Sequence, residues 1–153
     1  MPIQFIFTDT NIQLSNRTKL KLFIEKTLKQ KRRKLTSLAI IFCTDEYLLD
    51  INRRFLQHDY YTDIITFNLA GSSNTIEGEI YISVDRIKEN ALSNKVSKKE
   101  ELHRVIFHGV LHLCGFKDKK SGEKAKMTSA ENKHLKMYFG GFHESQFQRE
   151  TAK

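Results

Sequence analysis

The stretch SKKEELHRVIFHGVLHLCGFKDK, residues 97–119, decides the fold that the rest of the sequence must accommodate. Ser97 followed by Glu100 has the form of a capping box, which marks the start of a helix. A helix that begins there runs through apolar residues as far as Cys114. Gly115 suits the left-handed residue that ends many helices. The pattern therefore predicts a helix from Ser97 to Cys114 and a chain reversal after it.

His108 and His112 are four residues apart, so they project from one face of this predicted helix with Cβ atoms about 5 to 6 Å apart. Two imidazoles at that spacing can bind one metal ion. A continuous helix would carry Asp118 off this face, but the break at Gly115 lets it swing back. A His, His, Asp set leaves a fourth position open, as in catalytic zinc sites. The residues thus indicate one Zn²⁺ ion with three protein ligands plus water, or alternatively two ordinary hydrogen-bonded histidines on a partly buried helix.

Gly109 follows the first histidine inside the predicted helix. Glycine there destabilises a helix by roughly 1 kcal/mol relative to alanine, so we expect another backbone or a substrate to pass close to it. The HExxH motif of metalloproteases places its general-base glutamate at this position. Its absence argues against peptide hydrolysis by that route.

Outward from this helix, hydrophobic periodicity and turn residues divide the chain into further elements. Strands are expected at residues 3–7, 37–43, 62–69 and 78–84, and helices at 17–34, 45–55, 85–93, 97–114 and 122–139. The order βαβαββααα predicts an α+β fold, a single domain with a mixed sheet of about four strands covered by helices. We expect this domain to span residues 1–140 and residues 141–153 to form a polar C-terminal tail.

The chain is basic, with 26 lysine and arginine residues against 18 aspartate and glutamate residues and a net charge of +8. Much of the excess lies in the segment 26–34. It favours a polyanionic partner such as nucleic acid, although a solvated helix end also explains the cluster. No apolar run is long enough to span a membrane and the N-terminus lacks a secretory signal, so we expect a cytoplasmic protein. Two cysteines do not make a disulfide framework.

Three ordered motifs resemble those of a known family. HGVLHLCGFKD (108–118) is similar to the HGxLHLxGYDH signature of the YbeY family of metal-dependent single-strand endoribonucleases. INRRFLQHDYYTDIITFNL (51–69) resembles the family's LNxxYRxxDxPTDVLSF segment, and GEIYISVD (78–85) resembles its GDIxISxD strand. Together with the element order, the resemblance covers nearly the whole chain.

The resemblance implies metal ligation by His108 and His112, with Asp118 at the position of the family's third histidine. Leu56 stands where the family motif has an arginine, so we expect Arg53 or Arg54 to supply the contact with phosphate instead.

Other polar residues near these motifs receive weaker assignments. Thr62 and Asp63 are interpreted as cap or turn residues at a strand entrance. Lysines beside the proposed site are candidates for binding single-stranded RNA, or alternatively keep a basic surface hydrated: Lys117, Lys119 and Lys120.

The remaining histidines lack metal-site spacing. His103 lies about 140° around the predicted helix from His108, so we expect it at the surface or behind the ligands. Surface positions are expected for His58, His134 and His143.

The function that the resemblance implies is a zinc-dependent single-strand endoribonuclease acting in ribosomal RNA processing and in ribosome maturation or quality control. Its partners would be ribosomal RNA and the ribosome or ribosome-associated proteins. The nucleophile is either a metal-activated water or the 2′-hydroxyl of the RNA. The alternative is a ribosome-associated RNA-binding assembly factor with a structural metal and little or no catalysis, which the departure at Leu56 favours.

Overall fold

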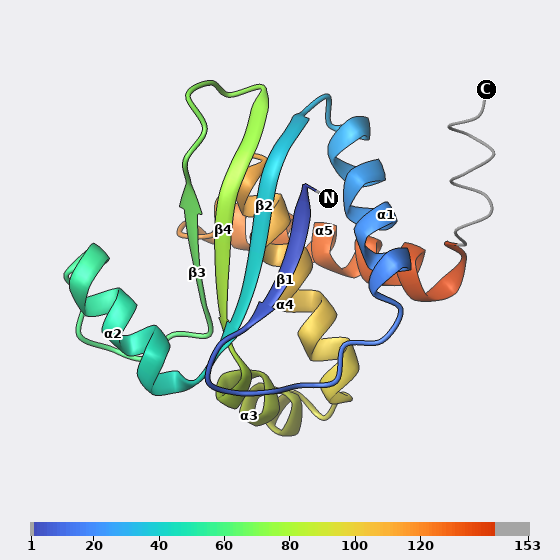
Figure 1. Cartoon of the computed structure of the whole chain (residues 1–153). Coiled ribbons are helices and arrows are strands. Elements are labelled where there is room, and N and C mark those ends of the chain that lie inside the picture. The colour runs from blue at the N-terminus through green and yellow to red at the C-terminus, as the bar shows by residue number, and fades with distance from the viewer. Residues whose placement is uncertain (1, 143–153) are drawn as a thin grey trace.

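The computed structural model describes residues 2–142 and contains four strands in one mixed sheet (Figure 1). The strands are β1 Ile3–Phe7, β2 Lys34–Cys43, β3 Ile64–Asn68 and β4 Thr75–Ser83. Their order is β1-β2-β4-β3, in which the β1/β2 and β2/β4 pairs are parallel and the β3/β4 pair is antiparallel. The predicted mixed sheet is therefore confirmed.

Five helices complete the described part of the chain: α1 Arg17–Gln30, α2 Asp45–Leu56, α3 Val84–Asn94, α4 Lys98–Leu113 and α5 Ser121–Gly140. The element order agrees with the predicted α+β fold. In α2, α3 and α4 an N-cap hydroxyl accepts a hydrogen bond from a backbone N–H three residues on, which pairs a donor that the helix start leaves free: Thr44, Ser83 and Ser97. None of these described helices is long and apolar enough to cross a membrane.

The first helix ends earlier than its periodicity predicts, because the basic segment forms a turn. The prediction extended this helix to Lys34, whereas α1 ends at Gln30 and β2 begins at Lys34. Arg32 is left-handed, with φ of 57°, and the backbone N–H of Arg33 donates to the carbonyl of Leu28 at 2.9 Å. This is the Schellman closure of a helix C-terminus. The positive charges therefore surround a turn between α1 and β2.

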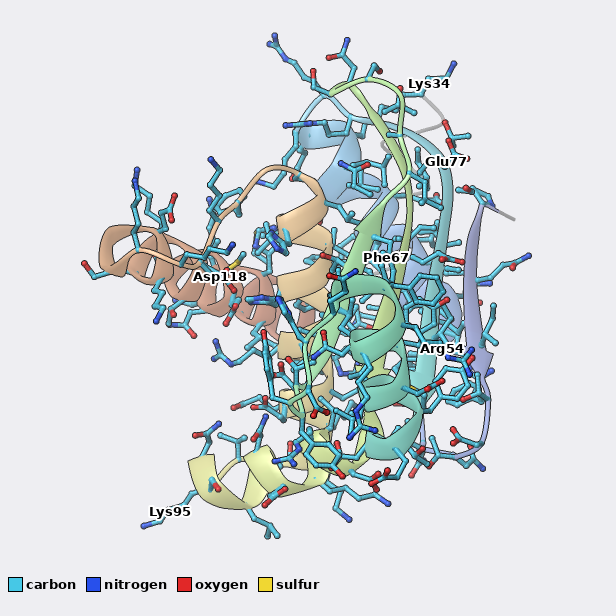
Figure 2. All side chains as sticks on the ribbon, turned by 90° about the vertical axis from the view of Figure 1, so that its left-hand side faces the viewer. Lys34, Arg54, Phe67, Glu77, Lys95 and Asp118 are labelled. Carbon is cyan, nitrogen blue, oxygen red and sulfur yellow. The ribbon has the colours of Figure 1, made fainter. Side chains whose placement is uncertain are left out.

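The two faces of the sheet pack against different helices, because successive side chains of a strand point to opposite sides. Ile80 and Ile82 of β4 belong to the main core, which they share with α1 and α4. Tyr81, between them, packs instead on the small cluster that contains Leu48 and Ile51 of α2. α4 and α5 lie together on one side of the strands (Figures 1 and 2). α4 is thus enclosed by the sheet and by α5.

Two glycines allow α4 to approach the sheet closely. A Cβ added at Gly109 would lie 3.0 Å from side-chain atoms of Ile64 and Ile80. A Cβ added at Gly78 of β4 would lie 2.8 Å from the carbonyl oxygen of Phe67 and 3.2 Å from the methyl groups of Leu113. The expected close approach at Gly109 is therefore present, but the neighbours are sheet side chains and not a backbone or a substrate.

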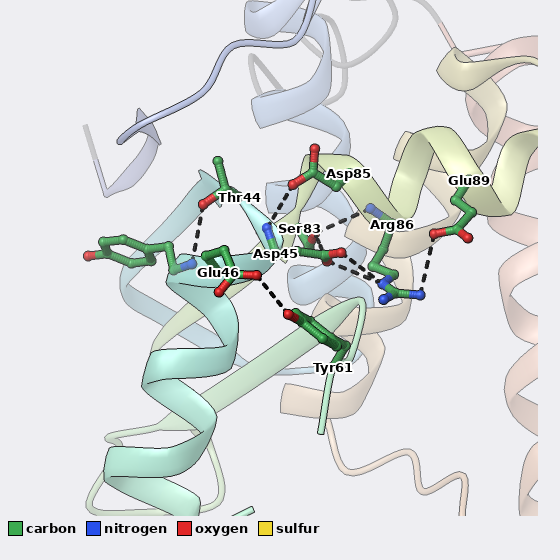
Figure 3. Close-up of polar contacts among 9 residues, drawn as sticks. Thr44, Asp45, Glu46, Tyr61, Ser83, Asp85, Arg86 and Glu89 are labelled. Carbon is green, nitrogen blue, oxygen red and sulfur yellow. Dashed lines mark hydrogen bonds and ion pairs between the residues drawn. The ribbon is translucent and has the colours of Figure 1, made fainter. Parts of the chain in front are cut away.

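A polar network joins the start of α2 to α3 and to the segment before β3 (Figure 3). Asp45 accepts a hydrogen bond from Ser83 Oγ at 2.7 Å and pairs with Arg86 at 3.2 Å. The hydroxyl of Tyr61 donates to Glu46 at 2.7 Å, and the guanidinium of Arg86 lies 5.2 Å from the Tyr61 ring centroid. These contacts fix the chain between α2 and β3 against the body of the fold.

We expect Gly78→Ala to lower the free energy of unfolding by about 1 to 3 kcal/mol, the usual range for overpacking a core site. The added methyl group has to displace the Phe67 carbonyl or the Leu113 side chain. Urea denaturation measures the change. Gly71→Ala is the matched control, because an added Cβ there meets no atom within 4 Å. Equal stability of the two variants would contradict this account of the close approach.

Candidate active site

A cavity of about 520 Å³ opens between α4, α5 and the segment that joins α2 to β3. Its wall combines carboxylates, imidazoles and one guanidinium: His58, Asp63, Glu101, Arg104, His108, His112, Asp118 and Glu131. The carboxylates outnumber the guanidinium, so the cavity favours a bound cation. All three predicted metal ligands lie on this wall.

The two histidines of α4 are oriented by hydrogen bonds through the same ring nitrogen. Nδ1 of His108 lies 2.7 Å from Glu131 Oε2, and Nδ1 of His112 lies 2.8 Å from the carbonyl oxygen of Phe116. Because the Phe116 carbonyl can only accept, Nδ1 of His112 carries the proton and its Nε2 keeps the lone pair when the ring is neutral. His108 faces carboxylates at both nitrogens, and the shorter contact, to Glu131, favours the proton on Nδ1. The centroids of the two rings are 6.1 Å apart.

Asp118 returns to the histidines because the helix breaks where the sequence predicts. Gly115 has φ of +101°, in the region that favours glycine, and the N–H of Phe116 donates back to the carbonyl of Leu111 at 3.1 Å. Asp118 lies on the loop that follows (Figure 2). Its Oδ2 is 3.3 Å from Nε2 of His108.

The donor set of the wall fits a zinc ion. Two imidazole Nε2 atoms and a carboxylate are the ligands that catalytic zinc sites use, and the Nδ1 atoms already have the acceptors that usually support such ligands. Within residues 2–142, however, no three His, Cys, Asp or Glu side chains are arranged around a common point as metal ligands. The assignment of His108, His112 and Asp118 as ligands therefore stays a prediction.

The wall also shifts the acidity of its own groups. Burial lowers the pKa of His108, but the hydrogen bond and charge of Glu131 and the charges of Asp118 and Asp63 raise it by more, so that this pKa lies above its usual value. Burial raises the pKa of Asp63, against the opposing effect of His108, and burial likewise raises the pKa of Glu101. Protons are thus retained where negative charge is concentrated, and a bound cation would compete with them.

Five of these wall residues were not assigned to the site from the sequence: His58, Asp63, Glu101, Arg104 and Glu131. Glu131 of α5 bonds His108 and also pairs with Arg104 at 3.0 Å. Asp63, interpreted from the sequence as a turn or cap residue, lines the cavity as well. One signal for Glu131 was available, since it sits on the buried stripe of α5 four residues from Met127 and four from Leu135.

The predicted RNA-contacting cations lie outside the cavity lining. Arg53 pairs with Asp59, and Arg54 pairs with Asp50 at 3.1 Å. The three candidate lysines are exposed on the loop that carries Asp118 and at the start of α5: Lys117, Lys119 and Lys120. Leu56 does line the cavity, so the departure from the family motif changes its surface.

Two histidines expected elsewhere are buried in an aromatic cluster. His103 is only 1% exposed and stacks on Tyr138 with ring centroids 5.2 Å apart, which corrects the expectation of a place at the surface or behind the ligands. His134 is also buried, so its predicted surface position is wrong. Each Nδ1 lies 2.7 Å from a backbone carbonyl one helical turn earlier, which pairs the N–H of a neutral imidazole. Nε2 of His103 is buried without a hydrogen-bond partner among the described residues. His58 is exposed as expected, and His143 lies outside the described residues.

Comparison with known proteins identifies related sequences over most of the chain. The family model described as Endoribonuclease YbeY matches residues 4–139. Endoribonuclease YbeY of Cytophaga hutchinsonii is 46% identical over 135 residues, which cover 88% of this chain and 94% of that protein. The protein of the same name from Parabacteroides distasonis is 40% identical over 135 residues, with the same coverage. The solution structure of TM1509 from Thermotoga maritima has a TM-score of 0.60 at 22% identity and 95% coverage of both chains, which supports the fold.

We expect His103→Phe to reduce the loss of stability in acid. Burial lowers the pKa of His103, so the unfolded chain binds a proton that the folded protein excludes, and this contribution to stability is lost as pH falls below about 6.5. Relative to wild type, the free energy of unfolding of the variant should therefore rise as the pH is lowered. Urea denaturation across this pH range measures it. His58→Phe, which removes an exposed histidine, is the control, and parallel curves for His103→Phe and wild type would refute the prediction.

Proposed function

The chain belongs to the endoribonuclease YbeY family, and from this membership we propose that it is a zinc-dependent endoribonuclease that cuts single-stranded RNA. Its proposed role is cytoplasmic, in ribosomal RNA processing and in ribosome maturation or quality control. The proposed partners are ribosomal RNA and the ribosome or ribosome-associated proteins. One observation carries the proposal: His108, His112 and Asp118 line a single cavity in which carboxylates outnumber the guanidinium.

The proposed ligands are Nε2 of His108, Nε2 of His112 and the carboxylate of Asp118. These residues would hold a zinc ion, which would supply Lewis-acid polarisation of a phosphate oxygen and of the attacking oxygen. The chain's own residues prepare the ligands. Glu131 and the carbonyl of Phe116 fix both rings through Nδ1, which would leave each Nε2 available to bind an ion.

Phosphate groups of the RNA are proposed to contact cations around the cavity. Arg53 and Arg54 are exposed, so each can exchange its carboxylate partner for a phosphate at small cost. The exposed cations of the loop that carries Asp118 are also proposed to bind phosphates: Lys117, Lys119 and Lys120. Attack by water and attack by the RNA 2′-hydroxyl differ in their products, since only the second yields a cyclic phosphate end.

The proposed catalytic domain is residues 1–140, with residues 141–153 as a polar tail. Packing extends slightly past this boundary, because Phe142 is buried against Phe23 with ring centroids 5.2 Å apart. The part of the proposed tail from 143 to 153 lies outside the described residues.

A second function is favoured by Leu56, which gives the cavity an apolar residue where the family motif has arginine. In that case the protein is a ribosome-associated RNA-binding assembly factor whose metal is structural. Chelation distinguishes the two functions. A metal-depleted protein that stays folded and binds RNA but no longer cleaves it supports the nuclease, whereas loss of the fold on chelation, without cleavage beforehand, supports the assembly factor.

We expect the wild-type protein to bind about one Zn²⁺ per chain, and His112→Ala and Asp118→Ala to retain much less, because each removes one of three proposed ligands. Elemental analysis after dialysis measures the content. Asp50→Ala removes an exposed carboxylate on α2 and is the matched control. Full zinc content in Asp118→Ala would show that Asp118 is not a ligand.

We expect Glu131→Gln to weaken zinc binding roughly 10- to 100-fold, the usual effect of removing a carboxylate that supports a histidine ligand. The substitution leaves the shape of the side chain but removes the charge that faces Nδ1 of His108. Competition with a chromophoric chelator gives the affinity. Glu89→Gln, an exposed glutamate of α3, controls for the change of charge. An unchanged affinity for a folded Glu131→Gln protein would exclude this role.

A further inference from the structure

The segment that follows α2 places two exposed rings at the rim of the cavity. His58 and Tyr60 both line it. Their rings are stacked, with centroids 5.2 Å apart and an interplanar angle of 20°, and the Tyr60 hydroxyl lies 3.0 Å from Nδ1 of His58. Tyr60 is 56% exposed. The pair therefore places two exposed rings on the same cavity wall as the proposed metal ligands.

The position of this pair is fixed by a buried asparagine. Asn52 is 2% exposed, and its Nδ2 donates to the carbonyl of Tyr60 at 2.9 Å. The carbonyl of Asn52 in turn accepts from the backbone N–H of His58 at 3.1 Å. Gln57, which directly precedes His58, is left-handed with φ of 57° and caps the C-terminus of α2. Because the backbone on both sides of the pair is bound to one core residue, little further order is lost when a ligand binds.

Of the neighbouring side chains, one is held by contacts with other residues and one extends the rim of the cavity. Tyr61 is held in place, since its hydroxyl donates to Glu46 and its ring lies against Arg86. Leu56 lines the cavity on the same segment and is 40% exposed. The rim on the α2 side therefore carries an apolar side chain, Leu56, where the family motif has a cation.

We propose that His58 and Tyr60 form a stacking shelf that receives one unpaired base of the RNA beside the phosphate to be cut. The proposal rests on the proposed ribonuclease function and names the part of the substrate that the rim recognises. Stacking on an aromatic ring is open to every base, because every base has a π face. The shelf therefore selects single-stranded over double-stranded RNA and has little sequence preference.

Charge supports RNA as the occupant. The chain carries a net charge of +8, so its surface attracts a polyanion. Within the cavity, however, the carboxylates outnumber Arg104 and repel a phosphate that arrives without a cation. Binding of an uncharged base avoids that repulsion. The shelf provides such a binding surface at the edge of the acidic wall.

The chain has no tryptophan, so Tyr60→Trp introduces a single fluorescent reporter at the shelf. We expect its fluorescence to be quenched on titration with a short 2′-O-methyl single-stranded oligonucleotide and to stay unchanged with the same oligonucleotide in a duplex. Leu92→Trp, on α3 at a site that is 79% exposed and outside the cavity lining, is the matched control and should not be quenched. An oligonucleotide with abasic sites should also fail to quench, which separates base stacking from phosphate contacts.

Steady-state cleavage provides the second readout. We expect Tyr60→Ala to raise KM for single-stranded RNA about tenfold, the order of effect of losing one stacked base, with little change in kcat. Tyr60→Phe keeps the ring and should stay near wild type. Absence of quenching in Tyr60→Trp, or an unchanged KM in a folded Tyr60→Ala protein that cleaves RNA, overturns the shelf. Quenching in Tyr60→Trp, together with no RNA cleavage by the wild-type protein, would instead uphold the shelf and refute the proposed nuclease activity.

Discussion

The close packing of α4 on the sheet is the contact on which the rest of the structure depends. An atom added at Gly109 would lie 3.0 Å from Ile64 and Ile80, so helix and strands meet at the limit that glycine allows. With position 109 turned to the sheet, His108 and His112 point about 60° to 100° away from it, both on the same side of the helix. One contact thus completes the core and aims both imidazoles into the cavity beside α5.

Features encoded by neighbouring residues could be predicted from the sequence. The cap at Ser97, the pair of histidines and the break at Gly115 each depend on residues within one or two helical turns, and all three are present. The strand and helix order follows from periodicity in the same way. The end of α1 was misplaced because a left-handed Arg32 gives no signal in composition, and only its backbone closure onto Leu28 reveals the turn.

Features made by packing between distant elements could not be predicted in this way. Glu131 meets His108 across 23 positions of sequence, because α5 crosses α4 and packs against it. His134 was expected at the surface and His103 at the surface or behind the ligands, because neither has metal-site spacing. Each pairs one nitrogen on its own helix and enters the cluster around Phe107 and Tyr138. Burial of a neutral imidazole depends on neighbours that spacing does not show.

The basic surface and the acidic cavity have opposite effects on the proposed RNA substrate, the first at long range and the second at short range. The basic surface attracts RNA from solution, whereas the carboxylates of the cavity repel a phosphate that enters it without a cation. A metal ion bound by His108, His112 and Asp118 would offset much of this negative charge, so binding of the ion and of the phosphate would support each other. Without the ion, an arginine at position 56 would be drawn toward the same carboxylates that surround the site. Leu56 is uncharged and is not attracted to them. Beside it, the stacked rings of His58 and Tyr60 can hold a base whatever the charge state of the cavity.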